Sequence, residues 1–161
     1  MHTYYLHLGS NLGEKKGFLQ KALELISTNI GEITLKSNIY ETEPWGLKEQ
    51  ENFLNMAIEV KSTKSPEDVI QSIKSIESAL GSAKAVKWGP RSIDIDVLYC
   101  DDQIINSSDI TIPHPHIKDR NFVLIPLLEI AGDFTDPVHK MTIDELYDIC
   151  KDTGEVFIFE E

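Results

Sequence analysis

Two aspartates, Asp94 and Asp96, are separated by one residue in a segment where apolar and polar side chains alternate. This period of two over residues 92–100 predicts a β-strand that carries both carboxylates on one face, roughly 6–7 Å apart. Such a pair repels and loses hydration unless a cation lies between them, and Mg²⁺ prefers oxygen ligands of this kind. The segment therefore predicts a magnesium site, although a solvated acidic edge strand would have the same pattern.

A rigid turn lies just before that strand. It consists of Trp88, Gly89, Pro90 and Arg91, and it would hold an aromatic ring and a guanidinium beside the two carboxylates. Guanidinium groups bind phosphate oxygens through paired hydrogen bonds, and metal ions bridge the phosphates of nucleotides. Together these groups favour a nucleotide polyphosphate as the ligand.

The composition limits the kinds of partner. The chain has 161 residues, with 27 acidic and 15 basic side chains and a net charge of −12. This length predicts one domain over residues 1–161. The negative charge argues against nucleic acid or an anionic membrane as the main partner, so an anionic substrate would need a local basic patch or a metal ion.

Neither a membrane span nor an export signal is visible in the pattern. No apolar run approaches the ~20 residues of a membrane span, and the N-terminal residues lack the pattern of a signal peptide. Cys100 and Cys150 have neither metal-binding nor redox spacing, so reduced thiols are expected. We therefore expect a cytoplasmic protein.

Hydrophobic periodicity predicts alternating strands and helices in the first hundred residues. One helix is expected between Gly13 and Gly31, and another begins at the N-cap Ser65 and ends at Gly81. The expected strands comprise residues 3–9, 33–40, 52–62 and 92–100. This order predicts an α+β fold with a ferredoxin-like βαββαβ core, in which both helices cover one face of an antiparallel sheet.

The rest of the chain is expected to add a loop, a hairpin and C-terminal helices to this core. Pro126 must lie in the first turn of a helix over residues 122–130, or kink it. Thr142 and Glu145 have the spacing of a capping box, which predicts a final helix to about residue 151, ended by Gly154. The other expected segments are a loop over residues 41–51, short strands at 103–105 and 110–112, and a last strand at 156–159.

Several side chains have two interpretations when each pattern is taken alone. Trp45, in the expected loop, is either a buried anchor or part of a lid over a flat ligand. Asn55 either reads the edge of a heterocycle or is satisfied by backbone groups. A solvated helix flank is the simpler interpretation of Glu77, and His7 is expected to be structural.

Two histidines alternate with two prolines at residues 113–116. His114 and His116 could bind a metal ion, but no third or fourth ligand is visible. Phosphate contacts are therefore preferred, with His114 and Arg120 as hydrogen-bond donors.

The turn over residues 9–13 lacks the Gly-Lys-Ser/Thr ending of a Walker loop.

Several segments taken together resemble the 6-hydroxymethyl-7,8-dihydropterin pyrophosphokinase family. The most specific are WGPRSIDIDVLY from Trp88 and PHPHIKDRNFVLIPLLEIA from Pro113, and the resemblance spans about residues 8–131. The others are LGSNLGEK from Leu8, YETEPWG from Tyr40, FLN from Phe53, and IE followed by LG from Ile76. The resemblance implies transfer of pyrophosphate from ATP to the hydroxymethyl group of a reduced pterin, with release of AMP, in folate biosynthesis.

The same resemblance implies a role for individual residues. Asp94 and Asp96 would hold two Mg²⁺ ions that bridge the ATP phosphates and the pterin hydroxyl, with Arg91 and Lys84 as further catalytic groups. The residues implied to bind the pterin are Thr42, Glu43, Trp45, Phe53, Asn55 and Phe122. The residues implied to bind ATP are Glu77, Lys84, Lys87, Trp88, Arg91, Thr111, His114, His116 and Arg120.

The chain departs from the family pattern after its second expected helix. The family usually has Gly-Arg-x-Arg there and an arginine before the tryptophan, whereas this chain has Ser82, Lys84 and Lys87. Lysine keeps the charge but loses the bidentate fork, and Ser82 removes one cation from the closing loop. The resemblance therefore implies that both substrates bind, with weaker closure and slower turnover.

Two other functions on the same fold would have different requirements. A non-catalytic domain that senses a small molecule needs no paired metal carboxylates beside Arg91 and His114. A metal-dependent phosphohydrolase would release phosphate or pyrophosphate without a pterin acceptor. The sequence leaves the general base open and is compatible with a monomer or a weak homodimer.

Replacing Ser82 with arginine tests the consequence of the departure from the family pattern. The Ser82→Arg variant should have a higher single-turnover rate of pyrophosphate transfer, because it returns a cation to the closing loop. Rapid-quench measurement of product under single-turnover conditions compares the variant with the parent. A rate that does not increase would reject the idea.

Overall fold

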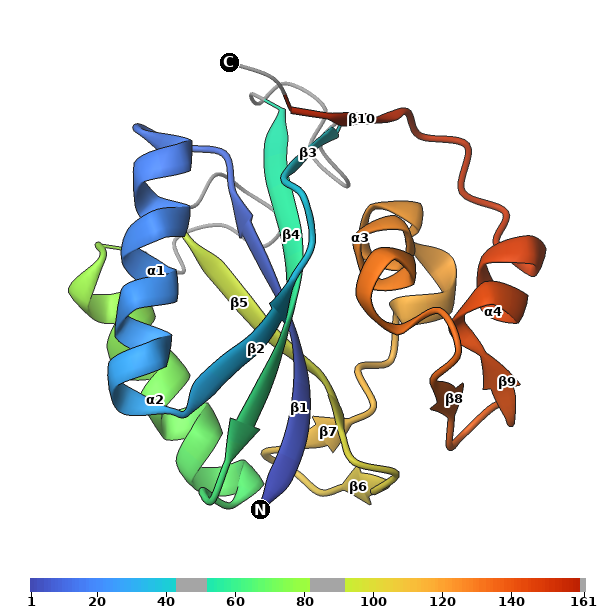
Figure 1. Ribbon diagram of the computed structural model, residues 1–161, viewed down its shortest axis with the longest axis horizontal. Coiled ribbons are helices and arrows are strands. Elements are labelled where there is room, and N and C mark those ends of the chain that lie inside the picture. The colour runs from blue at the N-terminus through green and yellow to red at the C-terminus, as the bar shows by residue number, and fades with distance from the viewer. Residues whose placement is uncertain (43–51, 82–91, 160–161) are drawn as a thin grey trace.

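Helices cover both faces of the main antiparallel sheet (Figure 1). The computed structural model describes residues 1–42, 52–81 and 92–159 (Figure 1). The elements up to residue 100 are β1 (His2–Ser10), α1 (Lys15–Asn29), β2 (Glu32–Lys36), β3 (Tyr40–Thr42), β4 (Phe53–Ser62), α2 (Pro66–Ala79) and β5 (Asp94–Cys100). Those that follow are β6 (Ile105–Asn106), β7 (Thr111–Ile112), the 3-10 helix η1 (Ile117–Asp119), α3 (Asn121–Ala131), β8 (Thr135–Asp136), β9 (Met141–Thr142), α4 (Ile143–Ile149) and β10 (Val156–Ile158).

The main sheet is antiparallel, and β1 lies between β4 and β5. Its strands follow the order β10-β3-β4-β1-β5, and β2 also pairs with β4. Because β2 and β3 together take the place of one strand, the order is that of a ferredoxin-like sheet, and the expected α+β fold is confirmed. In the register, Gly9 is opposite both Asn55 and Asp94.

Apolar side chains on the two faces of the sheet form two separate cores. Tyr4, Leu6 and Leu8 of β1 belong to the core against which α1 and α2 pack. Tyr5, on the opposite face, belongs to a second core that includes residues of α3 and α4. Figure 1 shows α1 and α2 on one side of the sheet and α3 and α4 on the other. The predicted alternation along this strand is therefore confirmed, and both of its faces are covered.

Helix α2 begins and ends where its sequence predicts. The Ser65 side chain accepts the backbone N–H of Asp68 at 3.3 Å, and Pro66 occupies the first helical position. Gly81 has a φ of 80°, a left-handed backbone conformation that residues other than glycine rarely adopt. This conformation ends the helix. These boundaries fix which residues of α2 face β5.

The second expected strand is interrupted at Ser37, which corrects the prediction of one strand over residues 33–40. The Ser37 backbone N–H donates to the carbonyl of Ala57 at 2.9 Å, and its Oγ accepts the Ala57 N–H at 2.9 Å. Because the Ser37 hydroxyl, and not a backbone carbonyl, accepts the N–H of Ala57, the backbone hydrogen bonds with β4 are interrupted here. The strand is therefore divided into β2 and β3. Glu41 and Thr42 then belong to β3 and not to the expected loop.

The C-terminal additions are helical, as expected, with corrections to their boundaries. Pro126 lies inside α3, beyond the first turn. The capping box of Thr142 and Glu145 is present, but α4 ends before Cys150, which already has an extended backbone. Gly154 therefore does not end this helix. The hairpin of β8 and β9 was not predicted.

No helix in the described ranges is long and apolar enough to cross a bilayer.

Gly31 follows α1 for a steric reason and not because a left-handed residue ends the helix. Its φ is not positive, unlike that of Gly13 or Gly81. A Cβ at Gly31 would instead collide with the backbone carbonyl of Lys61 on β4. Glycine at this position therefore permits the turn after α1 to approach the sheet.

Alanine at position 31 should lower the free energy of unfolding by about 2–3 kcal/mol, because the turn must move away from β4. The matched control is Gly17→Ala within α1, where the nearest contact of the new Cβ is the Cβ of Glu14 at 3.7 Å. This control should raise stability by up to about 1 kcal/mol, since alanine is the better helix former. Urea unfolding measures both variants, and parental stability of Gly31→Ala would contradict the steric argument.

Candidate active site

A pocket of about 460 Å³ lies where β1, β4 and β5 meet α2 and residues 109–122. It combines carboxylates, imidazoles, cations and aromatic rings. The polar and aromatic residues that line it are His7, Thr42, Phe53, Asn55, Lys74, Glu77, Asp94, Asp96, Asp109, Thr111, His114, His116, Arg120 and Phe122. A concave site of this size with converging polar groups is suited to a small ligand.

Asp94 and Asp96 are half-buried on one face of β5, opposite Gly9 and His7 of β1. Both carboxylates interact electrostatically with the guanidinium of Arg120. Burial lowers the pKa of Arg120, and the charges of Asp96 and Asp94 act in the opposite direction. The two carboxylates predicted from the alternation are therefore within electrostatic reach of a buried guanidinium.

Glu77 links α2 to β5 between the two aspartates. Its Oε2 accepts the backbone N–H of Ile95 at 2.9 Å. The side chain is half-buried and lines the pocket. The simpler interpretation of Glu77 as a solvated helix flank is therefore wrong.

Asn55 is 1% exposed and lies on β4 at the buried side of the pocket. Its Nδ2 donates to Oγ1 of Thr42 at 2.6 Å, which fixes the orientation of the amide. A Cβ at Gly9 would lie 3.2 Å from Oδ1 of Asn55 and 3.6 Å from the ring of Phe53. The glycine therefore leaves space beside this amide.

The ring of Phe122 contacts two other residues of the pocket. Cζ of Arg120 lies 5.6 Å from the centroid of the Phe122 ring. The His7 ring meets it edge-on, with the centroids 5.9 Å apart and the planes at 66°. Cation–π and edge contacts of this kind hold an aromatic ring in one orientation.

His7 lies in the wall of the pocket, although its sequence pattern predicts only a structural role. It is 4% exposed, and its Nε2 has no hydrogen-bond partner among the described residues. Burial lowers the pKa of His7 to about 3, and the charges of Arg120 and His114 act in the same direction. His7 is therefore neutral at pH 7. Its position opposite Asp96 could be found only once the pairing of β1 with β5 was known.

The position of His114 depends on a bulge in β5. The register with β1 shifts between Tyr5 and Leu6, which leaves Leu98 as an extra residue in β5. The carbonyl of Leu98 accepts the backbone N–H of His114 at 3.1 Å. The bulge therefore attaches the segment that follows β7 to the sheet.

The His114 ring is neutral and presents a hydrogen-bond donor. Its Nδ1 accepts the backbone N–H of His116 at 3.1 Å, so a neutral ring carries its proton on Nε2. Burial lowers the pKa of His114 to about 4, and the charges of Arg120 and His116 add to this effect. A donor of this kind suits a phosphate oxygen.

The structure brings together the predicted site residues that fall within its described ranges. Those that line the pocket are Thr42, Phe53, Asn55, Glu77, Asp94, Asp96, Thr111, His114, His116, Arg120 and Phe122. The predictions for Glu43, Trp45, Ser82, Lys84, Lys87, Trp88 and Arg91 lie outside the described residues.

An antiparallel sheet with helices on both faces, and a pocket that combines paired carboxylates, hydrogen-bond donors and a cation, is an arrangement suited to an enzyme of phosphate chemistry. A sequence profile described as 7,8-dihydro-6-hydroxymethylpterin-pyrophosphokinase (HPPK) matches residues 5–132, and the chain belongs to this family.

Relatives with assigned names agree with this membership. The 2-amino-4-hydroxy-6-hydroxymethyldihydropteridine pyrophosphokinase of Aquifex aeolicus (strain VF5) is 37% identical over 145 residues, 90% of each chain. The protein of the same name from Bacillus subtilis (strain 168) is 39% identical over 128 residues, 79% of this chain and 77% of that one. The Folic acid synthesis protein fol1 of Pneumocystis carinii is 38% identical over 144 residues, which are 89% of this chain but 20% of the relative.

Solved structures with the same fold are longer chains. One, titled "Crystal Structure Analysis of the HPPK-DHPS in complex with substrates", has a TM-score of 0.75 and 17% sequence identity over 91% of this chain. Plasmodium falciparum HPPK-DHPS wild type with SDX-DHP has a TM-score of 0.70 and 17% identity over 92% of this chain. This chain spans 43% of the length of each, and at this identity the likeness supports the fold alone.

The buried His7 predicts a loss of stability in mild acid. Its pKa is about 3 in the folded chain and about 6.5 in the unfolded chain, so below pH ~6.5 the unfolded state binds more protons. This contribution to stability is fully present above pH ~6.5. The free energy of unfolding should fall between about pH 6.5 and pH 4, by on the order of 3 kcal/mol from His7.

The variant His7→Leu isolates this contribution, because leucine fills a similar space without titrating. Urea unfolding at several pH values, without divalent metal ions, should give a shallower dependence on pH for the variant between pH ~6.5 and ~4. Parallel curves for the variant and the parent would show that His7 does not carry the effect.

Proposed function

We propose that the chain transfers pyrophosphate from ATP to the hydroxymethyl group of 6-hydroxymethyl-7,8-dihydropterin and releases AMP. Membership of the pyrophosphokinase family supports this reaction and its place in folate biosynthesis. The observation that carries the proposal is that Asp94, Asp96, Arg120 and Phe122 line one pocket. A triphosphate and a flat heterocycle need these groups in one place. The cytoplasm is the compartment that the sequence predicts.

The pterin stacks on Phe122 in this proposal, and Asn55 reads its edge. A flat heterocycle is stabilised by an aromatic ring, and an amide offers both a donor and an acceptor. Thr42 supports this role because it accepts one amide hydrogen of Asn55. The proposal assigns further pterin contacts to Phe53, Glu43 and Trp45.

The phosphates of ATP bind to donors from residues 111–120 in this proposal. His114 would donate through Nε2 and Arg120 through its guanidinium. Contacts that already hold His114 lower the entropy lost on binding. The proposal assigns further contacts with ATP to Glu77, Lys84, Lys87, Trp88, Arg91, Thr111 and His116, with Arg91 and Lys84 also in catalytic roles.

The donor set of Asp94 and Asp96 fits Mg²⁺, and we assign two ions to it. Mg²⁺ is commonly held by one or two carboxylates together with substrate phosphates, and these two carboxylates are half-buried in the pocket wall. Bound Mg²⁺ would neutralise phosphate charge and lower the pKa of the pterin hydroxyl.

The reaction is an in-line displacement at the β-phosphorus of ATP. The pterin hydroxyl oxygen forms a bond to this phosphorus, and the bond to the oxygen between the α- and β-phosphorus breaks, so AMP leaves with that oxygen. Arg120 and His114 would stabilise the charge on the transferred phosphoryl oxygens. The hydroxyl proton passes to Asp94 or to water.

Formation of AMP tests the proposed function. The full chain with ATP should form AMP only when Mg²⁺ and 6-hydroxymethyl-7,8-dihydropterin are both present, with one pyrophosphorylated pterin for each AMP. Release of phosphate or pyrophosphate without the pterin would contradict the proposal and indicate a phosphohydrolase. Ligand binding without turnover would contradict it too and indicate a sensing domain.

Removal of the Asp96 carboxylate should lower kcat at least about a hundredfold, because phosphate charge then lacks compensation during transfer. The affinity for the pterin should change far less, since Asp96 does not contact the heterocycle in the proposed arrangement. The matched control, Asp102→Ala, alters an exposed acid in the turn after β5. It should keep the parental kcat.

Initial rates of AMP formation measure kcat for both variants, and isothermal titration calorimetry measures pterin binding. Parental turnover in Asp96→Ala would remove the role assigned to this carboxylate. A loss of turnover in Asp102→Ala as large as that in Asp96→Ala would show that the effect is not local.

A further inference from the structure

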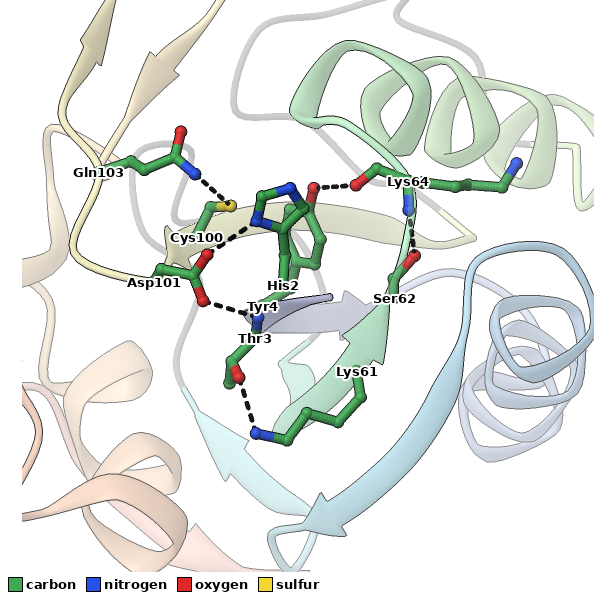
Figure 2. Close-up of polar contacts among 9 residues, drawn as sticks. All are labelled: His2, Thr3, Tyr4, Lys61, Ser62, Lys64, Cys100, Asp101 and Gln103. Atoms are coloured by element: carbon green, nitrogen blue, oxygen red, sulfur yellow. Dashed lines mark hydrogen bonds and ion pairs between the residues drawn. The ribbon is translucent and has the colours of Figure 1, made fainter.

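A second cluster of ligating side chains lies at the opposite end of β1 and β5 from the pocket. One ligand atom each from His2, Cys100 and Asp101 lies within 4.8 Å of the others (Figure 2). Along β5, residue 100 is about 20 Å from residue 94, which begins the acidic pair. The cluster is therefore distinct from the pocket described above.

Hydrogen bonds between β1 and the turn after β5 fix the carboxylate of this cluster. Oδ1 of Asp101 accepts the backbone N–H of Thr3 at 2.8 Å, and Oδ2 pairs with Nδ1 of His2 at 2.8 Å (Figure 2). The Asp101 N–H also donates to the Thr3 carbonyl at 2.8 Å. The fold itself therefore sets the distance between His2 and Asp101.

The Cys100 thiol is free and fully buried beside that carboxylate. Burial raises the pKa of the thiol, a contact with the Tyr4 hydroxyl lowers it, and the charge of Asp101 raises it further. Nε2 of Gln103 donates to the sulfur at 3.7 Å (Figure 2). Burial and the neighbouring carboxylate keep this thiol protonated when no cation is bound. A cation bound beside the sulfur would favour the thiolate.

We propose that His2, Cys100 and Asp101 form a binding site for a divalent transition metal ion of the Zn²⁺ type. Imidazole nitrogen, thiolate sulfur and carboxylate oxygen are ligands of Zn²⁺, and a water molecule would complete the tetrahedron. Ligand atoms of such a site are about 3.3–3.7 Å apart. Nδ1 of His2 and Oδ2 of Asp101, now 2.8 Å apart in their hydrogen bond, must therefore separate by roughly 0.5 Å, while the sulfur already lies within 4.8 Å of its partner atoms. Mg²⁺ takes oxygen ligands and would not compete here.

Metal binding at this site has a definite proton balance. Cys100 releases its thiol proton to solvent, and His2 moves its ring proton from Nδ1 to Nε2, which frees the Nδ1 lone pair. Asp101 stays ionised and keeps the Thr3 N–H on Oδ1. Thiolate and carboxylate then neutralise the charge of the ion, and one proton is released for each ion bound. The Gln103 amide would continue to orient the sulfur as an outer-shell donor.

Cobalt(II) is the probe, because a thiolate bound to it gives a charge-transfer absorption. The full chain, freed of metal with a chelator, should bind one Co²⁺ with this absorption. Zn²⁺ should displace it, and excess Mg²⁺ should not. Cys100→Ser should abolish the absorption, whereas Cys150→Ser, at the other free cysteine, should keep it.

His2→Ala provides a second test in case the buried Cys100→Ser substitution prevents folding. The His2 side chain is 32% exposed, so its removal should not disturb the core. Its affinity for Co²⁺ should fall at least about tenfold, while its formation of AMP stays at the parental rate. The proposal is overturned by an absorption that survives in Cys100→Ser, by its loss in Cys150→Ser, or by unchanged Co²⁺ affinity in His2→Ala. These outcomes do not depend on the proposed pyrophosphate transfer.

Discussion

The pairing of β1 with β4 on one side and β5 on the other determines where the groups of the pocket meet. Gly9 is opposite both Asn55 and Asp94, so a residue without a side chain separates the amide from the acidic pair. A slip of one residue would turn Asp94 and Asp96 toward the apolar core under α2 and expose Ile95. Burial of the apolar face therefore fixes the register, and the register fixes the chemistry.

The pocket combines a buried cation with neutral imidazoles in a chain whose net charge is −12. The pKa values of His7 and His114, about 3 and about 4, keep both rings uncharged at pH 7. Arg120, and not either imidazole, therefore carries fixed positive charge beside the acidic pair. Neutral rings can donate hydrogen bonds or pack against Phe122 without repelling that guanidinium, which is why burial of all these groups together is tolerated.

Features that depend on neighbouring residues were predictable, and features that depend on distant pairing were not. The alternation around Asp94 and the N-cap at Ser65 are local signals, and the structure has the strand and the helix that they predict. The break at Ser37 needs a hydrogen bond to a residue on β4, and the site position of His7 needs the pairing of β1 with β5. Cys100 and its neighbour Asp101 gave no metal signal, because the third member of the cluster, His2, is 98 residues away in the sequence.

Acidic side chains lie at the start of β5 and, with Asp101, directly after its end, and their chemical surroundings differ. Asp94 and Asp96 themselves offer carboxylate oxygen atoms, which suit a hard cation. Beyond the bulge at Leu98, the alternation is reversed, so Cys100 faces the core that contains Tyr4. An ion held by Cys100 and His2 would join β5 to β1, the same two strands whose pairing positions the acidic pair. Because that pairing is already made by the backbone, such an ion would stabilise the sheet without moving the pocket.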